Sequence, residues 1–119
     1  MRLRDALTVT QAQILSPDPD LDLEIRTGLA ADLMSDVLRY EVAGGLLVTG
    51  LTNPQIIRTA EVADVPAILM VRGKTPLPET VDLAHQVGIS ILGTQITMYE
   101  ACGRLYEAGL PACPYTEAK

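Results

Sequence analysis

The 119-residue chain contains no phenylalanine and no tryptophan, so tyrosine is its only aromatic residue. Its core must therefore be built from leucine, isoleucine, valine, alanine and methionine. Basic residues are also scarce, because 9 lysines and arginines stand against 15 aspartates and glutamates, for a net charge of −6. A general nucleic-acid-binding protein has the opposite charge balance. The longest apolar runs are far shorter than the roughly 20 residues of a membrane span. We therefore expect neither a nucleic-acid nor a membrane partner.

Cysteine and histidine are too few to suggest a reactive site. The chain has two cysteines, Cys102 and Cys113, and one histidine, His85. No CxxC pair is present, which excludes the usual zinc-binding spacings. We interpret Cys102 as a packed thiol, Cys113 as a tail thiol and His85 as a helical residue without a catalytic role. No pair of acid–base or nucleophilic side chains stands out. We expect a protein that is not an enzyme, has no catalytic residues and holds no metal or cofactor.

The overall composition is that of one globular domain. Apolar residues make up 48% of the chain and charged residues 20%, and its length is near the commonest domain size. We place the domain at residues 1–110 and a C-terminal tail at residues 111–119. The start, Met1–Asp5, is not followed by an apolar signal core, which predicts a cytoplasmic protein.

The first 44 residues predict a mixture of helices and strands. Apolar spacing indicates a helix over 3–11 and a short strand over 12–15, before a turn rich in proline and aspartate at 16–20. Alternating apolar and charged residues then predict a strand from Leu21 to Ala30. Asp32 follows, in a position to cap a helix over Leu33–Tyr40.

From Gly45 onward the sequence consists of three similar units, which recur roughly every 21 to 24 residues. Each unit is a continuous apolar strand, a glycine-containing turn and a helix, and such strands are typical of a parallel sheet buried on both faces. The predicted strands are Leu46–Thr49, Ile68–Val71 and Ile89–Leu92, and we expect them to be adjacent or nearly so. The predicted helices begin at Pro54, at Pro78 and after a Thr97–Glu100 capping box. The sequence thus predicts an α/β fold with a mainly parallel sheet and flanking helices.

Polar and glycine residues follow each of these three strands. Ligands bind beyond the carboxyl ends of the strands in open parallel sheets, where the first N–H groups of the following helices attract anions. Two of the nine basic residues, Arg72 and Lys74, lie there. We therefore predict a site for a phosphate or carboxylate ligand, although turn and cap chemistry alone is an open alternative. The candidate ligand-binding residues are Thr49, Gly50, Thr52, Asn53, Arg72, Gly73, Lys74, Thr75, Thr94 and Gln95.

The last helix carries a second candidate surface. Its residues Met98, Ala101, Cys102 and Leu105 have helical spacing and are expected to pack on the sheet. Tyr99 and Tyr106 fall on another stripe, with Gly103 between them. Tyrosine is enriched at interfaces, so we predict a symmetric homodimer that uses this stripe or the helix over 33–40. The alternative is that both rings cover the protein's own surface.

The order of the elements resembles the DRTGG domain, a small module related in fold to the N-terminal domain of HPr kinase/phosphorylase. In that family, a glycine-ended strand is followed by an Asp-Arg pair, and the next strand ends in Thr-Gly-Gly before a proline-containing turn. The corresponding stretches are 46–54 and 68–78, and 90–99 is similar to the family's last strand and helix start. The matching residues are Thr49, Gly50 and Gly73. Departures are Leu51-Thr52 in place of Asp-Arg, and Arg72 and Lys74 in place of the threonine and second glycine.

This resemblance covers residues 3–110 and implies a regulatory role. DRTGG domains occur beside catalytic domains, including regulated pyrophosphatases with nucleotide-sensing CBS modules and some phosphotransacetylases. The resemblance therefore implies a stand-alone, non-catalytic regulatory or ligand-sensing module. Such a module would homodimerise, bind a nucleotide or small anion and act on a partner enzyme. Two alternatives stay open. One is an interaction adaptor or subunit without a small ligand. The other is a small phosphotransfer enzyme, which would need an exposed histidine or aspartate at a strand end.

Overall fold

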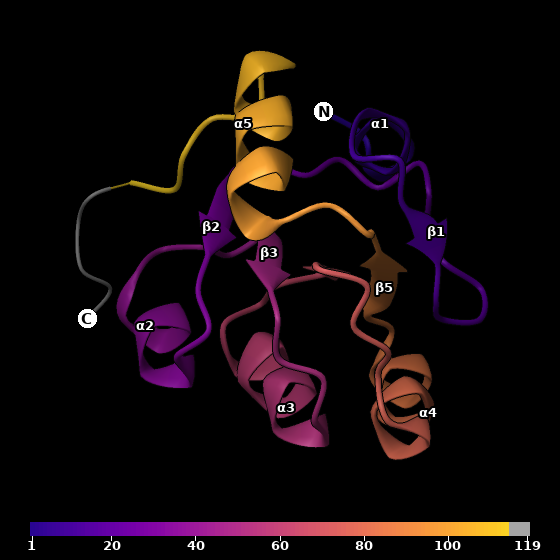
Figure 1. Ribbon diagram of the computed structural model, residues 1–119. Coiled ribbons are helices and arrows are strands. Elements are labelled where there is room, and N and C mark those ends of the chain that lie inside the picture. The colour runs from indigo at the N-terminus through magenta and orange to yellow at the C-terminus, as the bar shows by residue number, and fades with distance from the viewer. Residues whose placement is uncertain (115–119) are drawn as a thin grey trace.

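A five-stranded sheet runs through the middle of the molecule, with helices on both of its faces (Figure 1). The computed structural model describes residues 1–114. The strands are β1 (Gln13–Ile14), β2 (Gly28–Ala30), β3 (Leu46–Thr49), β4 (Ala67–Met70) and β5 (Ser90–Gly93). The helices are α1 (Leu3–Val9), α2 (Met34–Arg39), α3 (Pro54–Val62), α4 (Pro78–Val87) and α5 (Met98–Glu107). In this part of the chain, no helix has both the length and the apolarity needed to cross a membrane.

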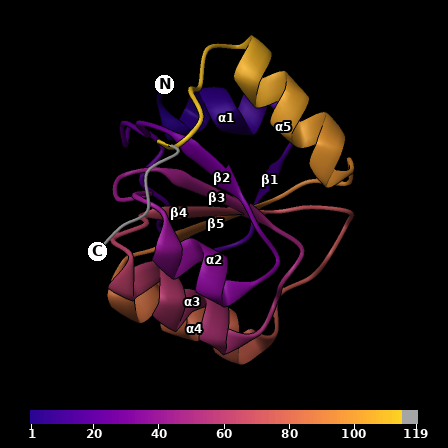
Figure 2. The ribbon, with the colours of Figure 1, turned by 90° about the vertical axis from the view of Figure 1, so that its left-hand side faces the viewer.

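The strand order is β1-β5-β4-β3-β2. Strands β2, β3, β4 and β5 are parallel to one another, whereas β1, at one edge, pairs antiparallel with β5. The predicted α/β class and mainly parallel sheet are therefore confirmed, and the three predicted central strands are neighbours. Helices α1 and α5 cover one face of the sheet, and α2, α3 and α4 cover the other (Figure 2). The HPr kinase N-terminal likeness stays a prediction.

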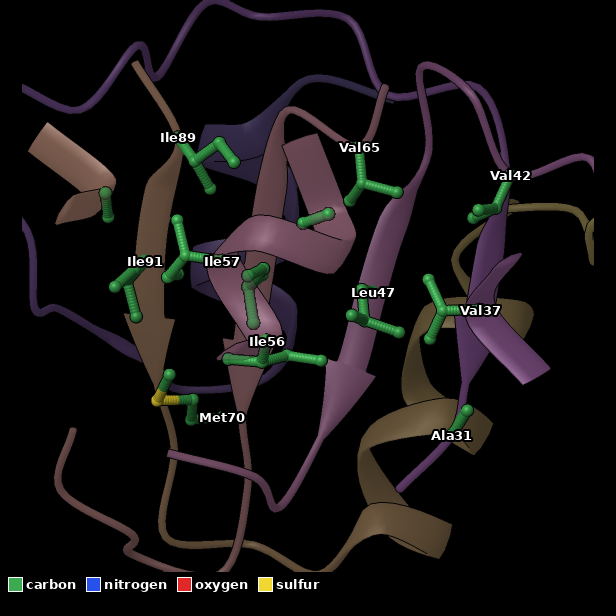
Figure 3. Close-up of a cluster of buried hydrophobic side chains, with 13 residues drawn as sticks. Ala31, Val37, Val42, Leu47, Ile56, Ile57, Val65, Met70, Ile89 and Ile91 are labelled. Carbon is green, nitrogen blue, oxygen red and sulfur yellow. The ribbon is translucent and has the colours of Figure 1, made fainter. Parts of the chain in front are cut away.

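The two sheet faces form two apolar clusters. All residues of β3 and β4 are buried, because side chains that alternate along each strand enter opposite clusters. Leu47 belongs to the cluster that includes residues of α2, α3 and α4, and Figure 3 shows it near Val37 and Ile56. Leu46 and Val48 belong to the cluster that includes residues of α1 and α5. Burial on both faces explains why these strands are continuous apolar runs rather than alternating ones.

Local signals in the sequence set the helix ends. Asn53 caps α3 by accepting a hydrogen bond from the N–H of Ile56 at 3.2 Å, and Pro54 occupies the first turn. Gly88 ends α4 in the left-handed conformation, with φ of +77°. Thr97 accepts a hydrogen bond from the N–H of Glu100 at 3.3 Å. The reciprocal half of the predicted capping box is replaced by an ion pair, because the Glu100 carboxylate binds Arg104 at 2.6 Å.

The strand predicted from Leu21 to Ala30 is wrong over most of its length. Only Gly28–Ala30 belongs to the sheet. The carbonyls of Leu21 and Leu23 instead accept hydrogen bonds from the first turn of α1, which has free N–H groups. The alternating pattern still reports burial, since Ile25 is 1% exposed beneath this turn.

An ion pair also fixes this segment to α1. Arg4 contacts Asp22 at 2.8 Å, and this hydrogen-bonded guanidinium holds the pKa of the Asp22 carboxyl below its usual value.

Part of the predicted tail lies against the sheet edge. The N–H of Gly28 donates to the carbonyl of Pro111 at 2.9 Å, and the N–H of Cys113 donates to the carbonyl of Gly28 at 3.0 Å. These bonds place residues 111–113 beside β2. Residues 115–119 of the predicted tail, with Tyr115, lie outside the described residues.

Candidate functional site

The three central parallel strands bring their carboxyl ends to one edge of the sheet. Thr49 of β3 lies beside Met70 of β4, and Met70 lies beside Gly93 of β5. The loops that follow these strands therefore leave the sheet at the same level. All ten candidate ligand-binding residues belong to this edge or to the loops that leave it.

Asp32 lies next to the carboxyl end of β3. One of its carboxylate oxygens accepts hydrogen bonds from the Thr49 hydroxyl at 3.0 Å and from the Gly50 N–H at 2.7 Å. The other oxygen lies 4.0 Å from Nη1 of Arg72. The predicted helix cap at Asp32 is therefore wrong: no side chain caps α2, and the carboxylate binds across the sheet to the ends of β3 and β4.

A left-handed turn ends the central strand β4. Arg72 has φ of +60° and Gly73 has φ of +66°. Their N–H groups donate to the carbonyls of Ile96 and Thr94, both at 2.9 Å. The left-handed conformation is unfavourable for residues that have a Cβ. Hydrogen bonds to the loop after β5 hold Arg72 in it.

Two glycines permit close approach at this edge. A Cβ on Gly50 would overlap Nη2 of Arg72, so the guanidinium lies directly over this glycine. A Cβ on Gly73 would lie 2.6 Å from Oε1 of Gln95, whose amide covers this turn. Only glycine at positions 50 and 73 leaves room for the Arg72 and Gln95 side chains, respectively.

A small polar cavity of about 110 Å³ opens on the β5 side of the edge. Amide, hydroxyl and ammonium side chains from three separate segments of the chain surround it. Gln11, one of its lining residues, has φ of +54°. The cavity is lined by Gln11, Gln13, Leu15, Gly73, Lys74, Thr75, Gly93, Thr94 and Gln95.

Three of the predicted site residues make hydrogen bonds that hold the fold together. The Asn53 side chain caps α3, as described above. The Thr52 carbonyl accepts a hydrogen bond from the Thr80 hydroxyl at 2.7 Å. The Thr94 side chain is buried and donates to the carbonyl of Thr10 at 2.6 Å. These three residues shape the loops, and the exposed chemistry lies on Arg72, Lys74, Thr75 and Gln95.

Sequence reasoning missed three residues of the edge. Asp32 follows β2 and precedes α2, where an aspartate is ordinarily a helix cap. Gln11 and Gln13 come from the segment between α1 and β1, and only the placement of β1 beside β5 brings them to the cavity. The available signal was an aspartate two residues after the end of β2.

An apolar groove of about 360 Å³ lies between α5, β2 and residues 110–112. The predicted packing of α5 is correct, since Ala101 and Leu105 are buried and Met98 and Cys102 pack against the same cluster. Burial raises the pKa of the Cys102 thiol. Tyr99 and Tyr106 border the groove and are 91% and 71% exposed, with Gly103 between them.

Potential metal ligands are dispersed. Within residues 1–114, no three histidine, cysteine, aspartate or glutamate side chains come together in a metal-binding group. His85 is exposed on α4. Cys113 lies beside the sheet edge, where burial first and Glu41 second raise the pKa of its thiol.

The fold is similar to that of part of a solved structure. The sequence matches no protein-family model and no curated protein. A crystal structure of the CBS and DRTGG domains of the regulatory region of Clostridium perfringens pyrophosphatase, complexed with its activator diadenosine tetraphosphate, superimposes with a TM-score of 0.72. The match has 17% sequence identity and covers 99% of this chain and 50% of that chain. The chain thus has a CBS/DRTGG-like fold and spans half the length of that regulatory region.

Proposed function

We propose that this chain is a non-catalytic regulatory module that binds a small anionic ligand at the carboxyl edge of its sheet. The observation that carries the proposal is the conformation of Arg72. Non-glycine residues in left-handed backbone conformations cluster at ligand-binding sites, where the surrounding structure imposes the strain. Arg72 has this conformation at the end of the central strand, next to Lys74, in a chain of net charge −6.

The cavity beside Lys74 and Gln95 supports a ligand of defined size. Its volume of about 110 Å³ is below the roughly 300–1,000 Å³ of pockets that hold a whole small molecule. It therefore suits one group of a ligand, such as a phosphate or a carboxylate. Ammonium, hydroxyl and amide donors around it fit an anion.

A nucleotide is the ligand class that we favour. The pyrophosphatase regulatory region with the similar fold is complexed with a nucleotide activator. We propose that this chain likewise senses a nucleotide or a smaller phosphate-bearing ligand. We also propose that it acts on a partner enzyme, since the similar fold belongs to the regulatory region of an enzyme.

We further propose that the module is a homodimer that uses α5. Tyr99 and Tyr106 are large, exposed and on the same groove, which is the composition of an interface rather than of a solvated helix face. Gly103 leaves space between them for a close approach, because nothing lies within 4 Å of a Cβ placed there.

A thermal-shift panel of nucleotides, inorganic phosphate and small carboxylates tests the ligand site. A ligand at 100 times its Kd is expected to stabilise the wild type by about 2.7 kcal/mol. Arg72→Ala with Lys74→Ala is expected to abolish this gain and leave the protein folded. Arg26→Ala with Arg58→Ala removes the same charge away from the edge and should preserve the gain. Equal stabilisation of the wild type and the Arg72/Lys74 variant by the same ligand would contradict a binding site at these residues.

The second candidate function is an interaction adaptor without a small ligand. The apolar groove beside α5 favours it, because apolar side chains from β2, α5 and residues 110–112 line an open surface. The same panel separates the two functions. Failure of every anionic ligand to stabilise the wild type would favour the adaptor.

A further inference from the structure

The Asp32 carboxylate occupies a position that suits an anionic ligand. We propose that Asp32 is a built-in occupant of an anion-binding site, and that a phosphate group binds there by displacing its carboxylate. This inference rests on the proposed function and places a phosphate group on the β3 side of the carboxyl edge, beside the cavity lined by Lys74 and Gln95 but outside it. It makes the apo form a self-occupied state in which the chain's own anion competes with the ligand.

The donors around Asp32 are those that bind phosphate. A backbone N–H from Gly50 and a hydroxyl from Thr49 converge on one carboxylate oxygen, at 2.7 and 3.0 Å. The guanidinium of Arg72 faces the other oxygen at 4.0 Å. Backbone amide, hydroxyl and guanidinium donors together form a site for any anionic oxygen, whether it belongs to a carboxylate or a phosphate.

Solvent reaches the side chains that would make this exchange. The Arg72 guanidinium lies directly over Gly50, in space that a side chain there would fill, so the glycine lets this donor lie close to the Asp32 carboxylate. The side chains of Asp32 and Arg72 are 46% and 44% exposed. A ligand can therefore approach both groups from solvent.

Displacement of Asp32 exchanges its hydrogen bonds from Thr49 and Gly50 for bonds from the same donors to the ligand. An ion pair that is this exposed and 4.0 Å long contributes little, because water screens it. The carboxylate caps no helix, so its rotation into solvent breaks no helix-capping bond of α2. Thr49 and Gly50 then donate to the incoming phosphate instead, and Arg72 gains a charge-assisted contact.

Calorimetric titration with inorganic phosphate tests the exchange in the whole chain. Asp32→Ala empties the site, so we expect its phosphate affinity to exceed that of the wild type by about tenfold or more, since a competing like charge is removed. Asp32→Asn retains an acceptor for Gly50 and Thr49 without the charge, and we expect an intermediate affinity. This second variant preserves the hydrogen bonds and guards against a folding defect in Asp32→Ala.

Two controls separate the exchange from general electrostatics. Asp36→Ala removes the same charge from α2 and is expected to change the affinity by about twofold or less. Adding Arg72→Ala to Asp32→Ala is expected to remove the gain.

Equal phosphate affinity of the wild type, Asp32→Ala and Asp36→Ala would overturn the exchange. That result would leave the proposed anion site standing, because the ligand panel and the Arg72/Lys74 variant test it separately. An equal gain in Asp32→Ala and Asp36→Ala would also overturn the exchange, since it would trace the effect to net charge.

Discussion

Arg72 combines a strained backbone conformation with a side chain that we propose binds the ligand. A left-handed conformation costs an L-residue with a Cβ about 1–2 kcal/mol. The fold maintains it because the N–H groups of Arg72 and Gly73 are both bound by carbonyls of the loop after β5. We infer that an arginine is present there for its side chain, since glycine would satisfy the backbone better.

A comparison of Arg72→Gly with Arg72→Ala tests this inference. Both variants lose the guanidinium, but only glycine relieves the strained φ of +60°. Arg72→Gly is expected to be more stable than Arg72→Ala by about 1 kcal/mol in urea denaturation. Neither is expected to retain ligand binding. Greater stability of the alanine variant would show that the backbone is not strained here.

At this scale, the sequence predicts the site only in part. The rule that strand ends carry ligand sites identifies Thr49, Gly50, Arg72 and Gly73, which the structure brings to one edge. It misses Asp32, because an aspartate before an amphipathic segment has the same appearance whether it caps a helix or reaches across a sheet. A side chain's partner across the sheet depends on strand order, which local patterns do not contain.

Among the elements, the central strands are the most constrained. Each is buried on both faces, so apolarity alone locates them, and their parallel order follows from the helices between them. The segment over 21–27 shows the limit of such patterns. Alternating apolar and charged residues indicate that one side of the segment is buried. They do not indicate whether its backbone pairs with a strand or with the start of a helix.

A charge in the central strand tests this arrangement. Leu47 is fully buried in β3, so Leu47→Asp places an unpaired carboxylate in the core. The expected cost is about 3–5 kcal/mol or more, a large part of a domain's stability, so circular dichroism should show an unfolded or barely stable protein. Leu38→Asp, at a position that is 48% exposed on α2, makes the same chemical change and should melt close to the wild type. A wild-type melting temperature for Leu47→Asp would refute the buried position of β3.

On the scale of the whole molecule, two surfaces have separate roles in the proposed function. The carboxyl edge carries exposed Arg72 and Lys74, while the groove beside α5 is apolar and carries Tyr99 and Tyr106. A regulatory module needs both kinds of surface, one for the ligand and one for a protein. Their separation allows each to be removed without the other.

Sedimentation velocity tests the protein surface. The wild type is expected to sediment as a dimer at tens of micromolar, and Tyr99→Glu with Tyr106→Glu as a folded monomer, because facing charges repel across a two-fold axis. Val62→Glu, which changes a 74% exposed apolar residue on α3, should stay dimeric. A monomeric wild type would end the dimer proposal while leaving the ligand site untouched.

The central claim is that the carboxyl edge of the sheet binds a small anionic ligand. The most direct test is a two-dimensional ¹H–¹⁵N spectrum of the labelled chain during titration with ATP and, separately, with inorganic phosphate. The account predicts saturable shifts concentrated at the amides of Gly50, Arg72, Gly73, Lys74 and Gln95, with little change along α5. Shifts confined to other surfaces, or a spectrum unchanged at millimolar concentrations of both ligands, would contradict it.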